Sequence, residues 1–312
     1  MGGGNGTTVT EFVLLGFSDI GSLLGLLFWG VVFIYLVTLM GNSLIVLLTL
    51  ADPALHSPMY FFLRHFSVVE LLYTSTIVPR MLADLRSPRP IISPAGCFTQ
   101  MYFFALFGVA ECCLLTAMAY DRYAAICRPL HYNTLMNRGA CVSMVGASYL
   151  MGVVTGTIHS ICIFTLPFQG DNTIQHFFCD VLPVLRLTTG STLWGEAGNL
   201  FVTVAFILTP FVLIIVSYAC ILATILGVAT SQGRWKVFST CSSHLFVVVL
   251  FFGTATVAYM RPGSDSTQDS DQIISFFYTV VTPMFNPFVY TLRNAEVTGA
   301  MRRLVKRYFG SP

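Results

Sequence analysis

Long stretches without a charged side chain constrain this chain more than any other feature of its sequence. Five stretches contain no Asp, Glu, Lys or Arg: 20–51, 139–170, 197–233, 237–260 and 272–292. Two more are apolar with few charges, since 59–79 holds Arg64 and Glu70 and 91–120 holds Glu111. One helical membrane crossing needs about 20 mostly apolar residues, whereas the strands of a membrane barrel alternate over segments of about ten. The stretches therefore predict an all-α membrane protein built as a bundle of seven transmembrane helices.

The composition excludes the soluble classes of protein. Only 10% of the 312 residues are charged and 55% are hydrophobic, while a soluble globular chain carries about 25% charged residues. The net charge of +2 gives no reason to expect a nucleic-acid partner. We expect residues 1–312 to form a single seven-transmembrane domain, with an outer N-terminal segment at 1–22, the helix bundle at 23–292 and a cytoplasmic tail at 293–312.

The distribution of basic residues predicts that the N-terminus lies outside and the C-terminus inside. In that orientation eleven of the 16 Lys and Arg residues fall in cytoplasmic segments: Arg64, Arg122, Arg128, Arg138, Arg234, Lys236, Arg293, Arg302, Arg303, Lys306 and Arg307. The outer segments hold Arg80, Arg86, Arg89, Arg186 and Arg261. An excess of Lys and Arg on the cytoplasmic side is the usual rule for helical membrane proteins.

Both ends of the chain carry a local signal. The first 20 residues lack the basic and apolar regions of a cleavable signal peptide. Asn5 begins the sequon Asn5-Gly6-Thr7 on the expected outer side, which predicts glycosylation. Residues 294–309 alternate basic with apolar side chains, which predicts a short amphipathic helix on the inner membrane face. A plain solvated tail is the alternative.

Several motifs occur in order along the chain, each near an expected helix end. They are Gly41-Asn42, LHSPMYFFL at 55–63, MAYDRYAAICRPLHY at 118–132, Ser217-Tyr218, KVFSTCSSHL at 236–245, and PMFNPFVY at 283–290 followed by Leu292-Arg293-Asn294. Together they resemble the vertebrate olfactory receptors, a family of rhodopsin-like G-protein-coupled receptors. The resemblance extends from about Glu11 to Arg307.

The resemblance implies a receptor and not an enzyme. Such a receptor binds a small volatile odorant and activates a stimulatory, olfactory-type G protein, which raises cyclic AMP. It lies in the plasma membrane, typically of sensory cilia, and trafficking chaperones assist its delivery. The alternative within the same fold is a receptor expressed outside the nose that senses a metabolite.

The switch that couples such a receptor to its G protein lies at the cytoplasmic ends of the helices. The resemblance assigns this role to Asp121, Arg122, Tyr123, Tyr218, Asn286, Pro287 and Tyr290. The adjacent acid, Asp121, offers Arg122 a local partner that protonation or helix movement can release. The alternative is that Arg122 merely extends its side chain to the lipid headgroups.

A ligand pocket is expected in the outer half of the bundle, on helix faces that match the family's pocket positions. Its predicted lining is Phe104, Ala105, Gly108, Val109, Asn199, Val202, Phe206, Phe252, Thr256, Tyr259, Phe276 and Thr279. The lining is mostly aromatic and aliphatic with one amide, which suits a small, uncharged, apolar ligand with one hydrogen-bonding group. Ordinary packing between helices is the alternative for part of this set. Phe252 departs from the family, which usually has Tyr there.

Glu70 and Glu111 are the only acids deep inside the expected spans, and intramembrane acids are candidate functional groups. Asn42 and Asn286 are expected at similar depth. In related receptors an acid of the second helix helps to hold a sodium ion, so we consider Glu70 and Glu111 a candidate sodium site. The alternative is a protonated, hydrogen-bonded polar core without an ion.

Cys97 and Cys179 fall in outer segments, and the resemblance pairs them in a disulfide. The family usually has a second bridge, but its expected positions hold Gln169 and Thr189. The remaining seven of the nine cysteines lie within spans and are interpreted as small apolar side chains. We expect no transition-metal site, because no cluster of ligands is apparent.

Other membrane functions lack their sequence signals. A transporter would show paired repeats with broken helices, and no repeat accompanies the prolines at 210, 283 and 287. A membrane enzyme would gather His, Asp or Glu at one depth. His159 and His244 instead lie on different helices, toward opposite membrane faces.

Overall fold

The computed structural model describes residues 9–168, 172–189, 193–227, 231–260, 268–291 and 295–309. Within these ranges only the backbone is described at 18–20, 231–240, 243, 268–269, 290–291, 295 and 307–309. Asn5, predicted to be glycosylated, and Gln169 therefore lie outside the described residues.

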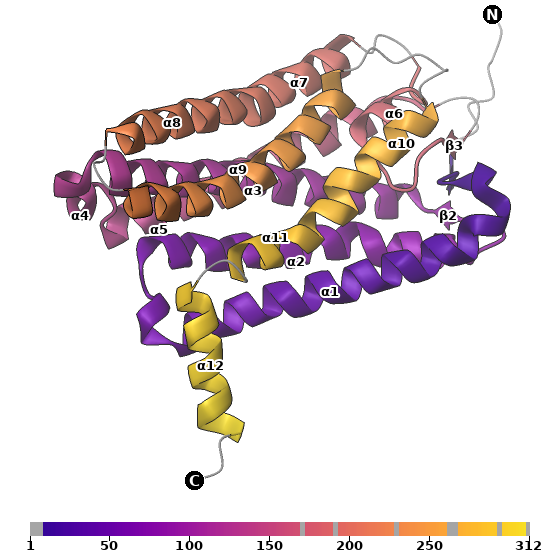
Figure 1. Ribbon diagram of the computed structural model, residues 1–312. Coiled ribbons are helices and arrows are strands. Elements are labelled where there is room, and N and C mark those ends of the chain that lie inside the picture. Colours follow the sequence, from indigo (N-terminus) through magenta and orange to yellow (C-terminus); the bar gives the residue numbers. More distant parts are fainter. Residues whose placement is uncertain are drawn as a thin grey trace, which may run out of the picture.

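Long helices lie side by side and make up most of the described chain (Figure 1). Four of them run without interruption: α1 (Leu24–Ala51), α2 (Pro58–Asp84), α3 (Pro94–Cys127) and α5 (Arg138–Phe164). A fifth rod joins α7 (Leu193–Thr203) through the π-helical turn η4 (Val204–Leu208) to α8 (Thr209–Leu226). The sixth is α9 (Ser231–Met260), and the seventh joins α10 (Gln268–Phe276) through the π-helical turn η6 (Phe277–Val281) to α11 (Thr282–Thr291).

Four helical segments of the described chain are long and apolar enough to cross a membrane: Gly21–Ala51, Pro94–Cys127, Arg138–Phe164 and Leu193–Leu226. The outer surface of α1 fits this reading, because Leu26, Trp29 and Met40 are each at least 70% exposed. Exposed apolar surface of that extent marks contact with lipid or protein. The helical architecture agrees with the sequence prediction, while the count of seven crossings and the orientation stay predictions.

Prolines in the first turn and side chains that cap the N-terminus set the starts of three helices. Pro58 and Pro94 occupy the first turns of α2 and α3, where the missing N–H costs nothing. The Ser93 hydroxyl accepts a hydrogen bond from the Gly96 amide at 3.1 Å. Asn137 caps α5 in the same way, by accepting from Ala140 N at 2.9 Å.

α3 runs through the middle of the bundle and packs against α2, α5 and α8. Its approach to α5 depends on a small residue, because a Cβ placed on Gly152 would overlap the carbonyl oxygen of Leu106. A Cβ on Gly156 would lie 2.8 Å from the carbonyl oxygen of Tyr102. Two glycines one turn apart therefore let the backbones of α3 and α5 approach closely, as small residues do between membrane helices.

A small sheet at one end of the bundle was not anticipated from the sequence. It consists of β1 (Phe12–Leu14), β2 (Ile91–Ile92) and β3 (Thr173–Ile174), in the order β2-β1-β3. β1 pairs antiparallel with β2, Phe12 opposite Ile92, and parallel with β3, Val13 opposite Thr173. We call this end of the bundle the disulfide end, because it also carries the disulfide between Cys97 and Cys179. The sheet ties the N-terminal segment to two loops there.

The opposite end carries short elements and the C-terminal helix. The short elements are η2 (Pro53–Leu55), η3 (Pro129–His131) and α4 (Tyr132–Leu135). α12 (Ala295–Phe309) turns away from the bundle axis (Figure 1) and buries Val297 and Ala300 against the other helices. Its Arg303 forms an ion pair of 2.7 Å with Asp52, just before η2. The position of α12 on a membrane stays a prediction.

Candidate ligand cavity and coupling face

A largely apolar cavity of about 80 Å³ lies between α3, the α7–η4 rod and α9. This volume is several times the roughly 10–15 Å³ that a single water requires. α3 contributes Phe104, Ala105, Gly108, Val109 and Cys112; the α7–η4 rod contributes Asn199, Val202, Thr203, Phe206 and Ile207; and α9 contributes Phe251, Ala255 and Tyr259. The lining is completed by Tyr73, His159, Val181 and Tyr278. The cavity can therefore enclose several waters or a very small organic molecule.

Eight of the twelve residues predicted for the pocket line this cavity: Phe104, Ala105, Gly108, Val109, Asn199, Val202, Phe206 and Tyr259. Their role in ligand binding stays a prediction. The other four, Phe252, Thr256, Phe276 and Thr279, do not line it.

On α9 the cavity meets the face of Phe251, Ala255 and Tyr259, which are spaced by four residues. Phe252 and Thr256 lie one position further along, so they point about 100° away around the helix. Phe252 is fully buried and stacks on Phe211, with ring centroids 5.8 Å apart. Over its first two positions, the predicted face of this helix is therefore one residue away from the face that lines the cavity.

The two predicted residues of the seventh rod have other neighbours. Phe276 packs edge-on against Phe17 of the N-terminal segment at 5.9 Å and against Phe177, in the loop that ends at Cys179 and Asp180, at 6.5 Å. Thr279 is fully buried and its hydroxyl donates to the Ser275 carbonyl at 2.7 Å. Both residues therefore serve packing in this structure.

Nine lining residues were missed from the sequence: Tyr73, Cys112, His159, Val181, Thr203, Ile207, Phe251, Ala255 and Tyr278. The spacing of Phe104 and Gly108 could have found Cys112, since it lies one further turn along the same face of α3. Val181 follows the predicted disulfide by two residues, so the bridge could have placed it. Tyr73 and His159 have no such local signal.

Polar groups are few in this cavity. Asn199 is 6% exposed, and its amide forms no side-chain hydrogen bond with any residue in the described ranges. His159 is 8% exposed and its ring lies against the backbone of Gly198. Nε2 of His159 has no hydrogen-bond partner in the part of the chain that the structure describes. The Asn199 amide is thus available to a ligand with a hydrogen-bonding group.

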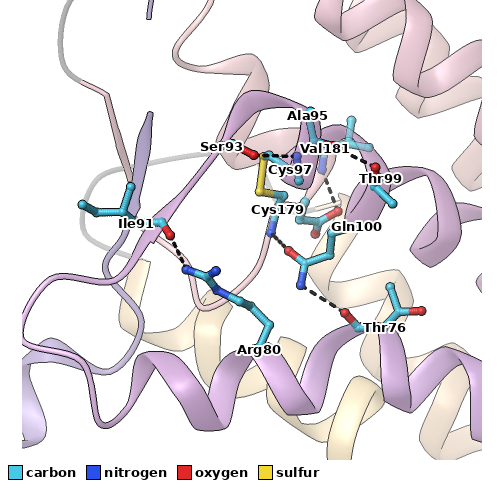
Figure 2. The surroundings of a disulfide bond; sticks show 12 residues. Thr76, Arg80, Ile91, Ser93, Ala95, Cys97, Thr99, Gln100, Cys179 and Val181 are labelled. Atoms are coloured by element: carbon cyan, nitrogen blue, oxygen red, sulfur yellow. Dashed lines mark hydrogen bonds between the residues drawn. A yellow bond between two sulfur atoms is a disulfide. The ribbon is translucent and has the colours of Figure 1, made fainter. Parts of the chain in front are cut away.

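A disulfide fixes the loop that covers the cavity. Cys97, in the first turn of α3, is bonded to Cys179, with Cα atoms 5.5 Å apart (Figure 2). The Gln100 side chain lies beside the bridge. Its oxygen accepts from the Cys179 amide at 2.9 Å, and its nitrogen donates to the Thr76 carbonyl at 3.2 Å. Gln100 thereby connects the loop with both α2 and α3.

Asp180 continues this cover. Its carboxylate accepts from the Val181 amide at 2.7 Å, which caps the short helix α6 (Val181–Leu185). It also accepts from the Tyr259 hydroxyl on α9, at 3.1 and 3.2 Å. Burial raises the pKa of Asp180 to about 6, and these hydrogen bonds oppose the rise. Burial also lowers the pKa of nearby His176 to about 3.

The opposite end of the bundle holds the predicted coupling residues. Asp121 is buried and accepts a hydrogen bond of 2.8 Å from the Tyr132 hydroxyl of α4. Arg122 contacts the Met59 sulfur and forms no ion pair with Asp121. Consecutive helical residues point in different directions, so the predicted local pairing of Asp121 with Arg122 is wrong in this structure.

The other predicted switch residues lie on three helices. Tyr123 is half-buried on α3. Tyr218 of α8 is buried and hydrogen-bonds to His244 of α9. Pro287 of α11 packs against Gly41 of α1, where a Cβ would lie 2.6 Å from the proline ring. The side chain of Tyr290 lies outside the described residues.

Comparison with known proteins assigns the family. The sequence profile described as "Olfactory receptor" matches residues 31–307. The chain is 75% identical to mouse olfactory receptor 10P22 and 58% identical to human olfactory receptor 10P1, over the full length of both chains in each case. It is also 51% identical to human olfactory receptor 10A7, over 96% of this chain and 95% of that one. The chain belongs to the olfactory receptor family. That family consists of G-protein-coupled receptors, which are not enzymes.

The interior of the olfactory receptor holds a buried polar cluster centred on Glu70. Asn286 donates a hydrogen bond to Glu70, and the Glu111 carboxyl faces Glu70 within hydrogen-bonding reach. Both glutamates are at most 1% exposed.

This cluster presents oxygen donors of the kind that a sodium ion takes. Glu70 Oε2, Glu111 Oε2 and Asn286 Oδ1 are buried and have no hydrogen-bond partner among the described residues. Carboxylate and amide oxygens are the donors that hard cations prefer. These oxygen donors therefore fit a sodium ion. A transition metal would require a cluster of His or Cys, which the described residues do not form.

Proposed function

We propose that this olfactory receptor binds a small, uncharged, mostly apolar volatile molecule in the cavity between α3, η4 and α9. The observation that carries the proposal is the lining itself: aromatic and aliphatic side chains surround one unengaged amide, that of Asn199. No Asp, Glu, Lys or Arg is among the described lining residues. A charged ligand would therefore lose its hydration without gaining a counterion, whereas an apolar ligand gains from leaving water.

The orientation follows from two independent features. Disulfides persist in oxidising compartments, so the end that carries Cys97 and Cys179 faces outside. The excess of Lys and Arg in the segments at the other end places that end in the cytoplasm. In this orientation the chain crosses the plasma membrane seven times and its cavity lies in the outer half of the bundle.

Ligand binding is proposed to shift α9 relative to α3 and thereby open the cytoplasmic end for a stimulatory G protein, which raises cyclic AMP. Tyr259 is exposed to the cavity near one end of α9, and His244, near the middle of the same helix, holds Tyr218 of α8. A single rigid helix therefore connects the ligand with the coupling face. Arg122 lies there without an ion-pair partner in the described ranges, ready to contact the G protein.

The proposal is tested by cyclic AMP measured in cells that express this chain, an olfactory-type G protein and a trafficking chaperone. A mixed panel of odorants is applied to the wild type, to Arg122→Ala and to Arg186→Ala, a change of an exposed arginine at the disulfide end. We expect a response in the wild type and in Arg186→Ala, and none in Arg122→Ala at equal surface expression. An undiminished response of Arg122→Ala would contradict the assigned coupling face.

A further inference from the structure

A second cavity, of about 510 Å³, lies at the end of the bundle away from the disulfide. It is formed by η2, the first turns of α2 and the start of α5, and it shares no lining residue with the apolar ligand cavity. Its volume falls within the roughly 300–1,000 Å³ of small-molecule sites. We call it the basic cavity, because Arg64, Arg138 and His56 line it.

Within the part of the chain that the structure describes, the two arginines have no ion-pair partner. No Asp or Glu is among the described lining residues of the cavity. The Arg64 guanidinium lies over the Phe61 ring, 5.4 Å from its centroid, which holds it in place without cancelling its charge. The nearby acid Asp52 is already paired with Arg303. The lining of the cavity thus carries two positive charges, of which that of Arg64 is held in place by the Phe61 ring.

Backbone dipoles add to this field. α2 begins at Pro58 and α5 begins at Arg138, and residues of both first turns line the cavity. The N-terminus of a helix carries about half a positive charge. Ser57, the residue that caps α2, makes no side-chain capping hydrogen bond, so the first turn of α2 lacks this internal acceptor. Two guanidinium groups and two helix starts therefore favour an anion with several negative oxygens.

The wall of the basic cavity is apolar on one side and continues into the exposed surface of α5. Val142 lines the cavity and is 52% exposed. Further along the same helix Leu150 is 61% and Val153 is 40% exposed. A ligand with a charged head and apolar chains can therefore place its head among the arginines and its chains along α5.

We propose that the basic cavity binds the phosphorylated headgroup of an anionic phospholipid, with Arg64 and Arg138 contacting its phosphate oxygens. Arginine suits this role because its planar group donates two parallel hydrogen bonds to phosphate. The proposal rests on the orientation given under the proposed function, since that orientation places the cavity at the cytoplasmic leaflet, where anionic lipids concentrate. The lipid would hold the short loop before α2 against the start of α5.

Binding is measured on the full-length receptor, purified and placed in nanodiscs, which expose both leaflets and need neither odorant nor G protein. Fluorescent phosphatidylinositol 4,5-bisphosphate is titrated into the nanodiscs, and unlabelled phosphatidylserine or phosphatidylinositol is then added as a competitor. We expect saturable binding that phosphatidylinositol and phosphatidylserine displace only weakly. Arg64→Gln combined with Arg138→Gln should weaken it at least about tenfold, while Arg302→Gln, a change of an exposed arginine on α12, should leave it unchanged.

Three results would overturn the proposal. One is wild-type affinity in the double variant, with its folding verified by thermal unfolding. Another is an equal loss of binding in Arg302→Gln, which would indicate a diffuse charge effect. The third is equally tight binding of soluble inositol 1,4,5-trisphosphate, which would identify a free anion as the ligand. Arg64→Lys with Arg138→Lys keeps the charge, and we expect it to retain part of the affinity. Because binding is read without signalling, a receptor that fails to respond to odorants can still support this proposal.

Discussion

The Asp180 carboxylate accepts hydrogen bonds of 3.1 and 3.2 Å from the Tyr259 hydroxyl, and this contact joins the disulfide-bonded loop to α9. Tyr278 extends the connection by donating to the Tyr259 hydroxyl at 3.4 Å. Tyr259 and Tyr278 also line the ligand cavity. The cover of the cavity, the sixth rod and the seventh rod therefore share one hydrogen-bonded chain, whose geometry a ligand can alter.

The first prediction concerns Tyr259→Phe. The change removes the donor to Asp180 and the acceptor for Tyr278 but keeps the ring, so the loss is that of buried hydrogen bonds, about 1–3 kcal/mol. We expect a lower unfolding temperature of the purified receptor and a weaker response to agonists. Tyr149→Phe on α5 serves as the control, because its ring packs against His65 and its hydroxyl makes no hydrogen bond among those described. Equal unfolding temperatures of Tyr259→Phe and wild type would show that the contact contributes nothing.

The second prediction is a pH dependence that Asp180 imposes. Its folded pKa of about 6 lies above its ordinary value of 3.8 because burial disfavours the charge. The folded receptor therefore takes up a proton that the unfolded chain does not hold, and the contribution of Asp180 to stability rises as the pH falls from about 7 to about 4. Two pKa units correspond to roughly 3 kcal/mol. Asp180→Asn stays neutral throughout, so it should lack this contribution.

The measurement is the difference in unfolding temperature between Asp180→Asn and wild type, taken at pH 7.5 and at pH 5. His176 has the opposite slope, because its lowered pKa costs stability as the pH falls below about 6.5. That contribution is present in both proteins and cancels in the difference. At pH 7.5 the asparagine variant avoids the cost of the buried charge of Asp180. We expect this gain in unfolding temperature over wild type to shrink when the pH falls to 5, because Asp180 then takes up its proton. A difference that stays constant with pH would refute the assignment to Asp180.

The length of the apolar stretches made most of the long helices predictable. The uncharged stretch 139–170 corresponds to α5, and the Asn137 cap fixes where that helix starts. The small sheet was not predictable, because β2 and β3 have two residues each and no periodicity can emerge over that length. Phe12, Ile92 and Ile174 are buried there only because three distant loops meet at one end.

The candidate site was predictable where one helix face decides it. Phe104, Gly108 and Cys112 follow from helical spacing on α3. By contrast, α9 has two neighbouring apolar faces, one with Phe251 and the other with Phe252, which differ only in their position around the helix axis. Sequence spacing cannot choose between such faces, because the contacts of the whole bundle set the rotation of the helix. The Asp121–Tyr132 hydrogen bond was missed for a similar reason, since it depends on where the α4 loop folds back.

The third prediction tests the close approach of α3 and α5. In Gly152→Ala the new methyl group would overlap the Leu106 carbonyl oxygen, and a backbone carbonyl cannot move aside without separating the helices. Overpacking of this kind costs about 1–3 kcal/mol or more. We expect much lower surface expression, measured by antibody labelling of intact cells. Gly146→Ala on the same helix is the control, because nothing lies within 4 Å of its added Cβ. Normal expression of Gly152→Ala would mean that the two helices are further apart than described.

The fourth prediction separates ligand binding from folding through Gly108, which lines the cavity on α3. A Cβ at this position meets only Tyr73 Cε2, at an ordinary contact distance of 3.7 Å, so alanine fits without strain. A leucine adds three further carbons, which must occupy the cavity of about 80 Å³. We expect Gly108→Leu to reach the surface at near wild-type levels while its cyclic AMP response falls at least about tenfold in potency. The potency of Gly108→Ala should lie between those of the wild type and of Gly108→Leu. Because leucine leaves the coupling face untouched, an unchanged potency in Gly108→Leu would place the ligand elsewhere in the receptor.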